Sequence, residues 1–284
     1  MADLASDNET NLRMNEPTFP VNLKNRLPFR LGTTSYIIPA GLLENVEFLA
    51  PYVDDVELVL FDSGGICNYP DMGEVAALRD LAAEHALTFT VHLPVDARLN
   101  HVDESIRARS VEEWLRVIDL TAPLEPFAYV AHLDGDRRGG SASDDVPAWR
   151  ERLSRSVGEL LKSGVPPDMI CVESLDYPLE FIEEIIFDHG LSICLDVGHL
   201  VYYGHPFARN LDRYLKRARV IHLHGVEDGH DHRGAHHFPP EKLEMLLERL
   251  RADAERDRVV TLEVFDLEDF QGSLTALDRR PAAR

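Results

Sequence analysis

The stretch Leu191-Ser192-Ile193-Cys194-Leu195-Asp196-Val197-Gly198-His199 joins a short apolar run to a carboxylate, a glycine and an imidazole. Other apolar runs, before and after it, end in Glu173, His222 and Glu263 in the same way. Four short β-like runs in succession therefore each place a possible metal ligand near their carboxyl end. We expect these strands to be neighbours in one barrel, with their polar side chains at one cation site.

Strand and helix patterns alternate along most of the chain. The expected strands are residues 29–36, 56–61, 88–93, 127–133, 169–174, 191–197, 220–224 and 259–265. The expected helices are residues 41–52, 72–86, 104–120, 149–162, 179–187, 209–217 and 241–251, with a weak eighth after residue 271. Such alternation implies a parallel sheet, and eight units of this total length predict a single (β/α)8 TIM barrel.

The barrel is expected to occupy residues 26–271. A polar, disordered lead-in is expected at residues 1–25, and a C-terminal tail at residues 272–284. No glycine-rich phosphate-binding motif follows a strand, which disfavours a dinucleotide-binding fold.

Composition restricts the partners and the compartment. The 284 residues include 50 acidic and 29 basic ones, for a net charge of −21, which disfavours a nucleic acid substrate. Cys67, Cys171 and Cys194 show no CxxC spacing, which indicates a reducing compartment without disulfides. No apolar run reaches the roughly 18–20 residues of a membrane span, and no signal-peptide core is present. We expect a cytoplasmic protein that acts on a small molecule.

Polar side chains gather at the expected strand ends. They are His92, His132, Glu173, Asp196, His199, His222 and Glu263, with Glu57 on the second strand as a further candidate. A single histidine of this kind is usually only a hydrogen-bonded residue, but unpaired charges in apolar strands cost several kcal/mol. The combined pattern therefore predicts a divalent cation. Imidazole and carboxylate ligands favour zinc, with manganese and iron as alternatives.

The number of candidate ligands exceeds the needs of one ion, so one to three ions are expected. The loop after the seventh strand adds Asp231 and His232, which are equally well explained as a solvated loop. Arg137 and Arg138, after the fourth strand, are candidates for contact with a substrate phosphate, although solvated arginines are the simpler explanation. The chain has no Gly-x-Ser-x-Gly nucleophile motif.

These motifs resemble the xylose isomerase-like barrel superfamily, which includes endonuclease IV and many sugar-phosphate isomerases and epimerases. The strongest similarities are Asp196-Val197-Gly198-His199, His222-Leu223-His224, Glu173 and Glu263. Resemblance to the nuclease branch implies three zinc ions. Their implied ligands are His92, His132 and Glu173 for the first, Glu173, Asp196, His222 and Glu263 for the second, and His199 with an Asp-x-His motif for the third. Here that last motif departs from the pattern, because Asp228-Gly229-His230 and Asp231-His232 compete for the role.

Within the superfamily, residues 31–36, 54–61, 92–96 and 222–226 are similar to the CbiR family of cobamide-remodelling hydrolases. This resemblance implies hydrolysis of the phosphoester in the nucleotide loop of a cobamide, which releases cobinamide phosphate and the lower-ligand nucleoside. We expect Glu173, Glu263 and Glu57 to be the catalytic carboxylates.

Three alternatives remain. A one-metal isomerase or epimerase of sugars or sugar phosphates would use Glu173 and Glu263 as its acid and base. An abasic-site endonuclease is disfavoured by the acidic composition. A non-enzymatic barrel would bind a corrinoid or sugar tightly without turnover.

Overall fold

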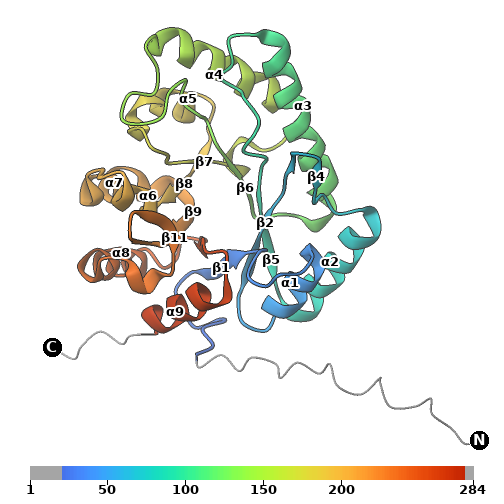
Figure 1. The fold of residues 1–284 in the computed structure, drawn as a ribbon, viewed down its shortest axis with the longest axis vertical. Coiled ribbons are helices and arrows are strands. Elements are labelled where there is room, and N and C mark those ends of the chain that lie inside the picture. The colour runs from blue at the N-terminus through green and yellow to red at the C-terminus, as the bar shows by residue number, and fades with distance from the viewer. Residues whose placement is uncertain (1–20, 279–284) are drawn as a thin grey trace, which may run out of the picture.

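The computed structural model of the chain describes residues 21–278. Eight of their strands form a closed barrel in the order β1-β12-β9-β8-β7-β6-β5-β2, and every neighbouring pair is parallel (Figure 1). The barrel strands are β1 (Arg30–Thr34), β2 (Asp55–Val59), β5 (Thr88–His92), β6 (Ala128–Ala131), β7 (Ile170–Glu173), β8 (Ser192–Asp196), β9 (Ala218–Leu223) and β12 (Val259–Leu262). The predicted (β/α)8 barrel is confirmed.

Helices surround the barrel on its outside (Figure 1). They are α1 (Leu42–Leu49), α2 (Met72–His85), α3 (Glu104–Thr121), α4 (Val146–Leu161), α5 (Glu183–Asp188), α6 (Val197–Tyr202), α7 (Phe207–Tyr214), α8 (Pro240–Ala252) and α9 (Leu267–Leu277). Within residues 21–278, no helix combines the length and the apolar character needed to cross a membrane.

Two helices differ from the expectation. The short helix α6 was not predicted; it begins directly after β8, where the Asp196 side chain accepts a hydrogen bond from the His199 backbone N–H. Helix α9 crosses the boundary that was expected at residue 271, because Leu274 and Leu277 are buried against the barrel. Most of the expected lead-in, residues 1–20, lies outside the described residues.

Two antiparallel hairpins extend from carboxyl ends of barrel strands, where only loops were expected. The first, β3 (Asp62–Ser63) with β4 (Ile66–Cys67), follows β2, and the second, β10 (Gly225–Glu227) with β11 (His230–Arg233), follows β9. Positive φ angles occur at both central residues of each turn, which are Gly64, Gly65, Asp228 and Gly229. Gly-Gly and Asp-Gly are the pairs that such tight hairpin turns favour.

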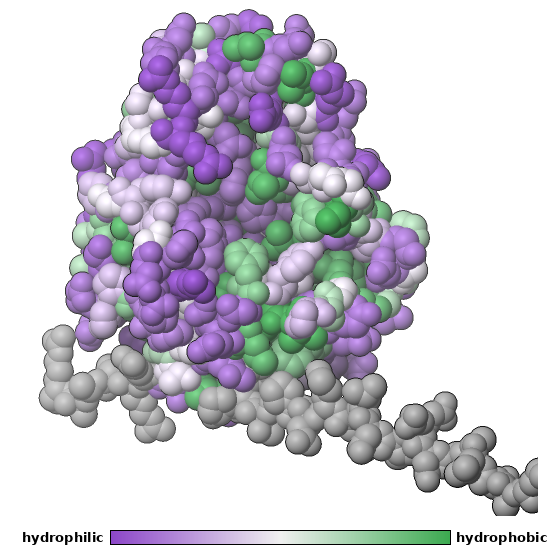
Figure 2. All heavy atoms as spheres, in the orientation of Figure 1, coloured by the Kyte–Doolittle hydropathy of each residue, from purple (hydrophilic) through white to green (hydrophobic). Residues whose placement is uncertain are grey.

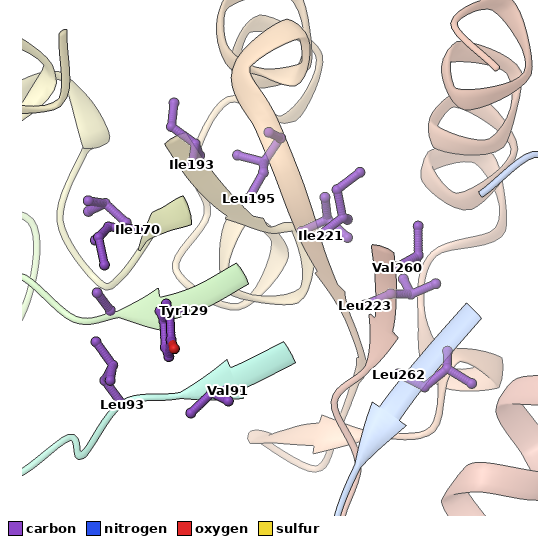
Figure 3. Close-up of a cluster of buried hydrophobic side chains, with 14 of the residues drawn as sticks. Val91, Leu93, Tyr129, Ile170, Ile193, Leu195, Ile221, Leu223, Val260 and Leu262 are labelled. Atoms are coloured by element: carbon purple, nitrogen blue, oxygen red, sulfur yellow. The ribbon is translucent and has the colours of Figure 1, made fainter. Parts of the chain in front are cut away.

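Side chains alternate between the two faces of each strand. The outward-facing ones form a large apolar core with the helices, and Figure 3 shows several of them, including Leu195 and Ile221. The inward-facing apolar residues form a small separate cluster that includes Cys171, Cys194 and Val220. Because successive inward positions are two residues apart, the next inward residue on each of these strands is Glu173, Asp196 or His222. The strand period thus places the predicted ligands next to this inward-facing apolar cluster, towards the carboxyl ends of the strands.

Candidate metal centre

Ten side chains meet at the C-terminal end of the barrel, where enzymes of this fold carry their active sites. This ligand cluster consists of His92, His132, Glu173, Asp196, His199, His222, His224, Asp231, His232 and Glu263. All nine metal ligands predicted from the sequence belong to it, and His224 is the addition. Each barrel strand from β5 to β9, and β12, contributes at its carboxyl end.

Glu173 lies at the centre of the ligand cluster and is 1% exposed. Its Oε2 is 3.0 Å from His132 Nε2 and 3.4 Å from His92 Nε2. The same oxygen is 3.6 Å from His222 Nδ1. Glu173 is therefore shared by two groups of donors, one formed with His92 and His132 and the other with Asp196, His222 and Glu263.

The second group contains buried donor atoms that lack hydrogen-bond partners among the described residues. They are Asp196 Oδ2, His222 Nδ1 and Glu263 Oε2. His222 Nδ1 is only 3.1 Å from Glu263 Oε2, yet the two atoms do not form a hydrogen bond. Buried polar atoms are almost always satisfied, and an exception calls for an explanation such as an ion. The residues present therefore fit a divalent cation bound between them.

Outer contacts hold two of the imidazoles in the orientation that ligands need. The His92 Nδ1 is 3.0 Å from the Leu93 carbonyl oxygen, which directs Nε2 towards Glu173. The His222 Nε2 is 3.0 Å from Glu57 Oε2, which directs Nδ1 towards the second group. A carboxylate or carbonyl behind a histidine ligand fixes its tautomer and its ring orientation.

Glu57 was expected to be catalytic. The structure instead places it behind His222, where it is fully buried and accepts a hydrogen bond from Thr261. It also does not line the groove into which the ligand cluster opens. We therefore assign it the role of orienting His222.

A third group consists of His199, His224 and His232. His224 is fully buried, its Nε2 is 3.2 Å from Asp196 Oδ1, and its ring stacks on that of His232 at 4.4 Å. His224 belongs to a motif identified in the sequence, but it was not predicted as a ligand. The period of two along β9 was the available signal, because His224 follows His222 on the inward face.

The geometry of the hairpin β10–β11, which follows β9, determines which of its residues lie beside the ligand cluster. His232 Nε2 is 3.3 Å from Glu263 Oε2, and Asp231 Oδ2 is 4.0 Å from His199 Nε2. Asp228 and His230 are exposed at the turn and take no part. The hairpin thus places Asp231 and His232, and not Asp228 and His230, beside the ligand cluster.

The carboxylates and imidazoles of the cluster shift one another's pKa values. Burial lowers the pKa of His199, but the Asp196 and Glu173 carboxylates outweigh it and raise that pKa to about 10. Burial raises the pKa of Glu173, but the charges of His132 and His222 hold it well below its ordinary value. Glu173 is thus ionised at neutral pH and requires positive charge beside it. Protons on the imidazoles or bound cations can supply it.

The ligand cluster opens into a groove of about 870 Å³. Members of the cluster line one side, and the loops after β5 and β6 line the other, where Arg137 and Arg138 are exposed and Arg137 is paired with Asp144. Figure 2 shows a largely hydrophilic face with apolar side chains gathered over the region of β1, β5 and α1. Ile66 on the first hairpin and Phe265 after β12 are 66% and 45% exposed, and the Phe265 ring lies 5.5 Å from that of His232.

Comparisons with known proteins agree with this architecture. Among solved structures, the chain is similar to a D-tagatose 3-epimerase-like protein (TM-score 0.68, 20% identity, covering 88% of this chain and 96% of that one). It is also similar to endonuclease IV from Thermus thermophilus (TM-score 0.63, 20% identity, covering 88% of this chain and 99% of that one). A third similar structure is the IOLI protein with a binding zinc atom (TM-score 0.64, 16% identity, covering 88% of this chain and 96% of that one). At these identities the similarity establishes the fold alone. No curated protein sequence matches the chain.

A family model described as xylose isomerase-like TIM barrel matches residues 53–280. The matched segment contains every member of the ligand cluster. The chain therefore belongs to the xylose isomerase-like TIM barrel family.

Proposed function

We propose that this protein is a metal-dependent phosphoester hydrolase that cleaves the nucleotide loop of a cobamide. Water adds to phosphorus, the bond between phosphorus and the nucleoside oxygen breaks, and the products are cobinamide phosphate and the lower-ligand nucleoside. The observation that carries this proposal is the position of Glu173. It is shared by His92 and His132 on one side and by Asp196, His222 and Glu263 on the other. Two ligand groups that share one carboxylate suit two cations, the arrangement that favours in-line displacement at phosphorus.

Each residue has a place in this chemistry. His92 and His132 would hold one cation, Asp196, His222 and Glu263 would hold another, and Glu173 would contact both. When bound, such cations lower the pKa of water and neutralise the charge that develops on phosphoryl oxygens. Arg137 and Arg138, on the opposite side of the groove, would orient the substrate phosphate.

The choice of a cobamide depends on the four segments similar to cobamide-remodelling hydrolases. Three of them contain the carboxyl ends of β1, β2 and β9, and the fourth begins at His92, the last residue of β5. The size of the groove agrees with a large substrate, because pockets for drug-sized ligands measure roughly 300–1,000 Å³. Phe265, exposed beside the His232 ring at the edge of the ligand cluster, also suits a substrate with an apolar surface.

The test is product analysis. Purified protein loaded with zinc, manganese or iron is incubated separately with a cobamide, a panel of ketoses and their phosphates, and abasic-site DNA, and the products are identified by mass spectrometry. We expect cobinamide phosphate and nucleoside, with the rate reduced about 100-fold or more in Glu173→Gln. Glu248→Gln, an exposed change on α8, is the matched control and should retain full activity. Unchanged cobamide with every metal would reject the proposal.

A one-metal sugar epimerase is the second candidate. The group of Glu173, Asp196, His222 and Glu263 could by itself hold one cation, and several similar solved structures bear the names of sugar epimerases. In that reaction Glu173 and Glu263 would exchange a proton with the sugar carbon.

The double variant His92→Gln/His132→Gln separates the two candidates. Hydrolysis needs the cation that these imidazoles hold and should be lost, whereas epimerisation does not use them and should survive. A ketose that is epimerised equally by the double variant and by the unmodified protein would support the second candidate.

A further inference from the structure

A second set of metal-ligating side chains lies outside the groove. It consists of His236 and His237, in the 3-10 turn Ala235–His237 after β11, and Asp269 in the first turn of α9. Their donor atoms all lie within 4.8 Å of one another. We call these three residues the distal cluster. None of them lines the groove of the candidate metal centre.

The carboxylate of the distal cluster is held in place by the backbone of the turn. Asp269 is 7% exposed, and its Oδ1 accepts a hydrogen bond of 2.7 Å from the Gly234 N–H. The next backbone N–H, that of Ala235, donates to Ser273 Oγ at 2.7 Å. Two consecutive bonds from the turn to α9 thus fix Asp269 beside the two histidines.

The two imidazoles are packed closely. The His236 ring lies against the backbone of Gly234 and Gly272, where a Cβ at either glycine would come within 3.0 Å of it. The ring centroids of His236 and His237 are 4.0 Å apart. His237 Nδ1 is also 3.4 Å from Glu227 Oε1, on strand β10. Three donor side chains therefore meet between the hairpin β10–β11 and α9, and Glu227 adds a carboxylate beside His237.

We propose that the distal cluster binds a divalent cation, with Glu227 as the fourth ligand. Two imidazoles and two carboxylates are the donors that zinc, cobalt and nickel accept. Arg233 is 3.7 Å from Asp269 Oδ2, a loose ion pair that leaves this oxygen available.

An ion at the distal cluster would connect the hairpin β10–β11 to α9. Glu227 ends one side of the hairpin β10–β11, and His236 and His237 follow its other side. A cation bound there would fix the two sides of the hairpin to α9. The same hairpin presents Asp231 and His232 to the ligand cluster, so the distal ion would order part of the metal centre.

Ion counting tests the proposal independently of any activity. Native mass spectrometry and elemental analysis are applied to zinc-loaded protein, to His236→Gln/His237→Gln, and to the centre variant Glu173→Gln/Asp196→Asn/His222→Gln. We expect the distal variant to hold one ion fewer than the unmodified protein. The centre variant should retain an ion that is lost when the two sets of changes are combined. His85→Gln, a remote imidazole on α2, is the matched control and should change nothing.

Two further readouts guard against misfolding. Asp269→Asn keeps an oxygen for the Gly234 N–H and should fold, but it should bind the distal zinc roughly tenfold more weakly in a chelator competition. In the centre variant, zinc should slow hydrogen exchange at residues 226–237, and this effect should be smaller without His236 and His237. If the folded variant His236→Gln/His237→Gln bound as many ions as the unmodified protein, the proposal would be overturned. Because the centre variant is catalytically disabled by design, the result does not depend on the proposed hydrolase function.

Discussion

The absence of a side chain at Gly198 leaves room for the imidazole of His224. Gly198 lies in the first turn of α6, and the His224 imidazole occupies the space where a side chain at residue 198 would lie. His224 itself is buried with Nε2 unpaired among the described residues and 3.2 Å from Asp196. The motif Asp196-Val197-Gly198-His199 therefore combines two candidate ligands with the space that admits a third, His224, from the neighbouring strand.

Gly198→Ala is expected to displace His224 and to abolish binding of an ion by the group of His199, His224 and His232. A Cβ at this position would come within 3.0 Å of the His224 ring, and such overpacking costs about 1–3 kcal/mol. The measurement is the ion count by elemental analysis together with chemical denaturation. Gly158→Ala in α4 is the matched control, because the nearest atom to its new Cβ is 3.8 Å away. An unchanged ion count in Gly198→Ala would show that His224 is not a ligand.

At the scale of elements, strand β8 and helix α6 share Asp196. Its Oδ1 caps the helix by accepting the His199 N–H at 2.7 Å, while Oδ2 faces the second donor group. One side chain thus caps a helix and places a carboxylate oxygen in the candidate metal centre. The helix in turn fixes His199, three residues later, beside the same site.

Two substitutions at Asp196 should separate these roles. Asn caps helices as well as Asp does, so Asp196→Asn should leave the stability of the metal-free protein almost unchanged while it weakens metal binding by about tenfold or more. Asp196→Ala should lose the cap as well and destabilise the metal-free protein by about 1 kcal/mol more. Thermal unfolding in chelator and competition with a chromophoric chelator provide the two measurements. Equal stabilities of the two variants would contradict a capping role.

At the scale of the whole molecule, the ligand cluster joins strands from most of the barrel. His222 and Glu57, which are hydrogen-bonded, are 165 positions apart in the chain. Cations at this point would therefore connect distant segments and stabilise the closed barrel.

Removal of metal should lower the melting temperature. A ligand present at about 1,000 times its dissociation constant contributes about 4 kcal/mol, which for a chain of this size corresponds to a change on the order of 10 °C. Differential scanning fluorimetry with and without chelator, followed by return of zinc, measures the effect. A melting temperature that is independent of chelator would argue against bound cations in the folded protein.

The stability of the molecule should also depend on Asp55, inside the opposite end of the barrel. Burial raises the pKa of Asp55 from 3.8 to about 7, and the hydrogen bond that Thr88 donates to its carboxylate opposes the rise only in part. The folded form therefore keeps a proton that the unfolded chain loses, so stability falls as the pH rises from about 4 to about 7.

Asp55→Asn should remove this slope and make the protein more stable than the unmodified chain at pH 8. The raised pKa of Asp55 corresponds to a decrease in the free energy of unfolding on the order of 4 kcal/mol between low and high pH. Urea denaturation at pH 5 and pH 8 measures it, with the exposed Asp188→Asn as control. A parallel pH dependence in Asp55→Asn and the unmodified protein would assign the slope to other groups.

The amino-acid sequence by itself determined the eight strands, the alternation with helices and nine of the ten cluster residues. These follow from local patterns, because a strand has a period of two and its carboxyl end is the place for polar side chains in a barrel. The motif Gly64-Gly65 and the pair Asp228-Gly229 also marked the two hairpins, although we had expected loops there.

Only the tertiary structure decided how the ligands are grouped. Closure of the barrel brings Glu173 between two donor groups, adds His224 to the third, and places Glu57 behind His222. It also turns Asp231 and His232 towards the centre and leaves Asp228 and His230 exposed. Sequence patterns report which face of an element a residue occupies. Distances between elements depend on strand order, register and hairpin geometry, which arise when the chain folds.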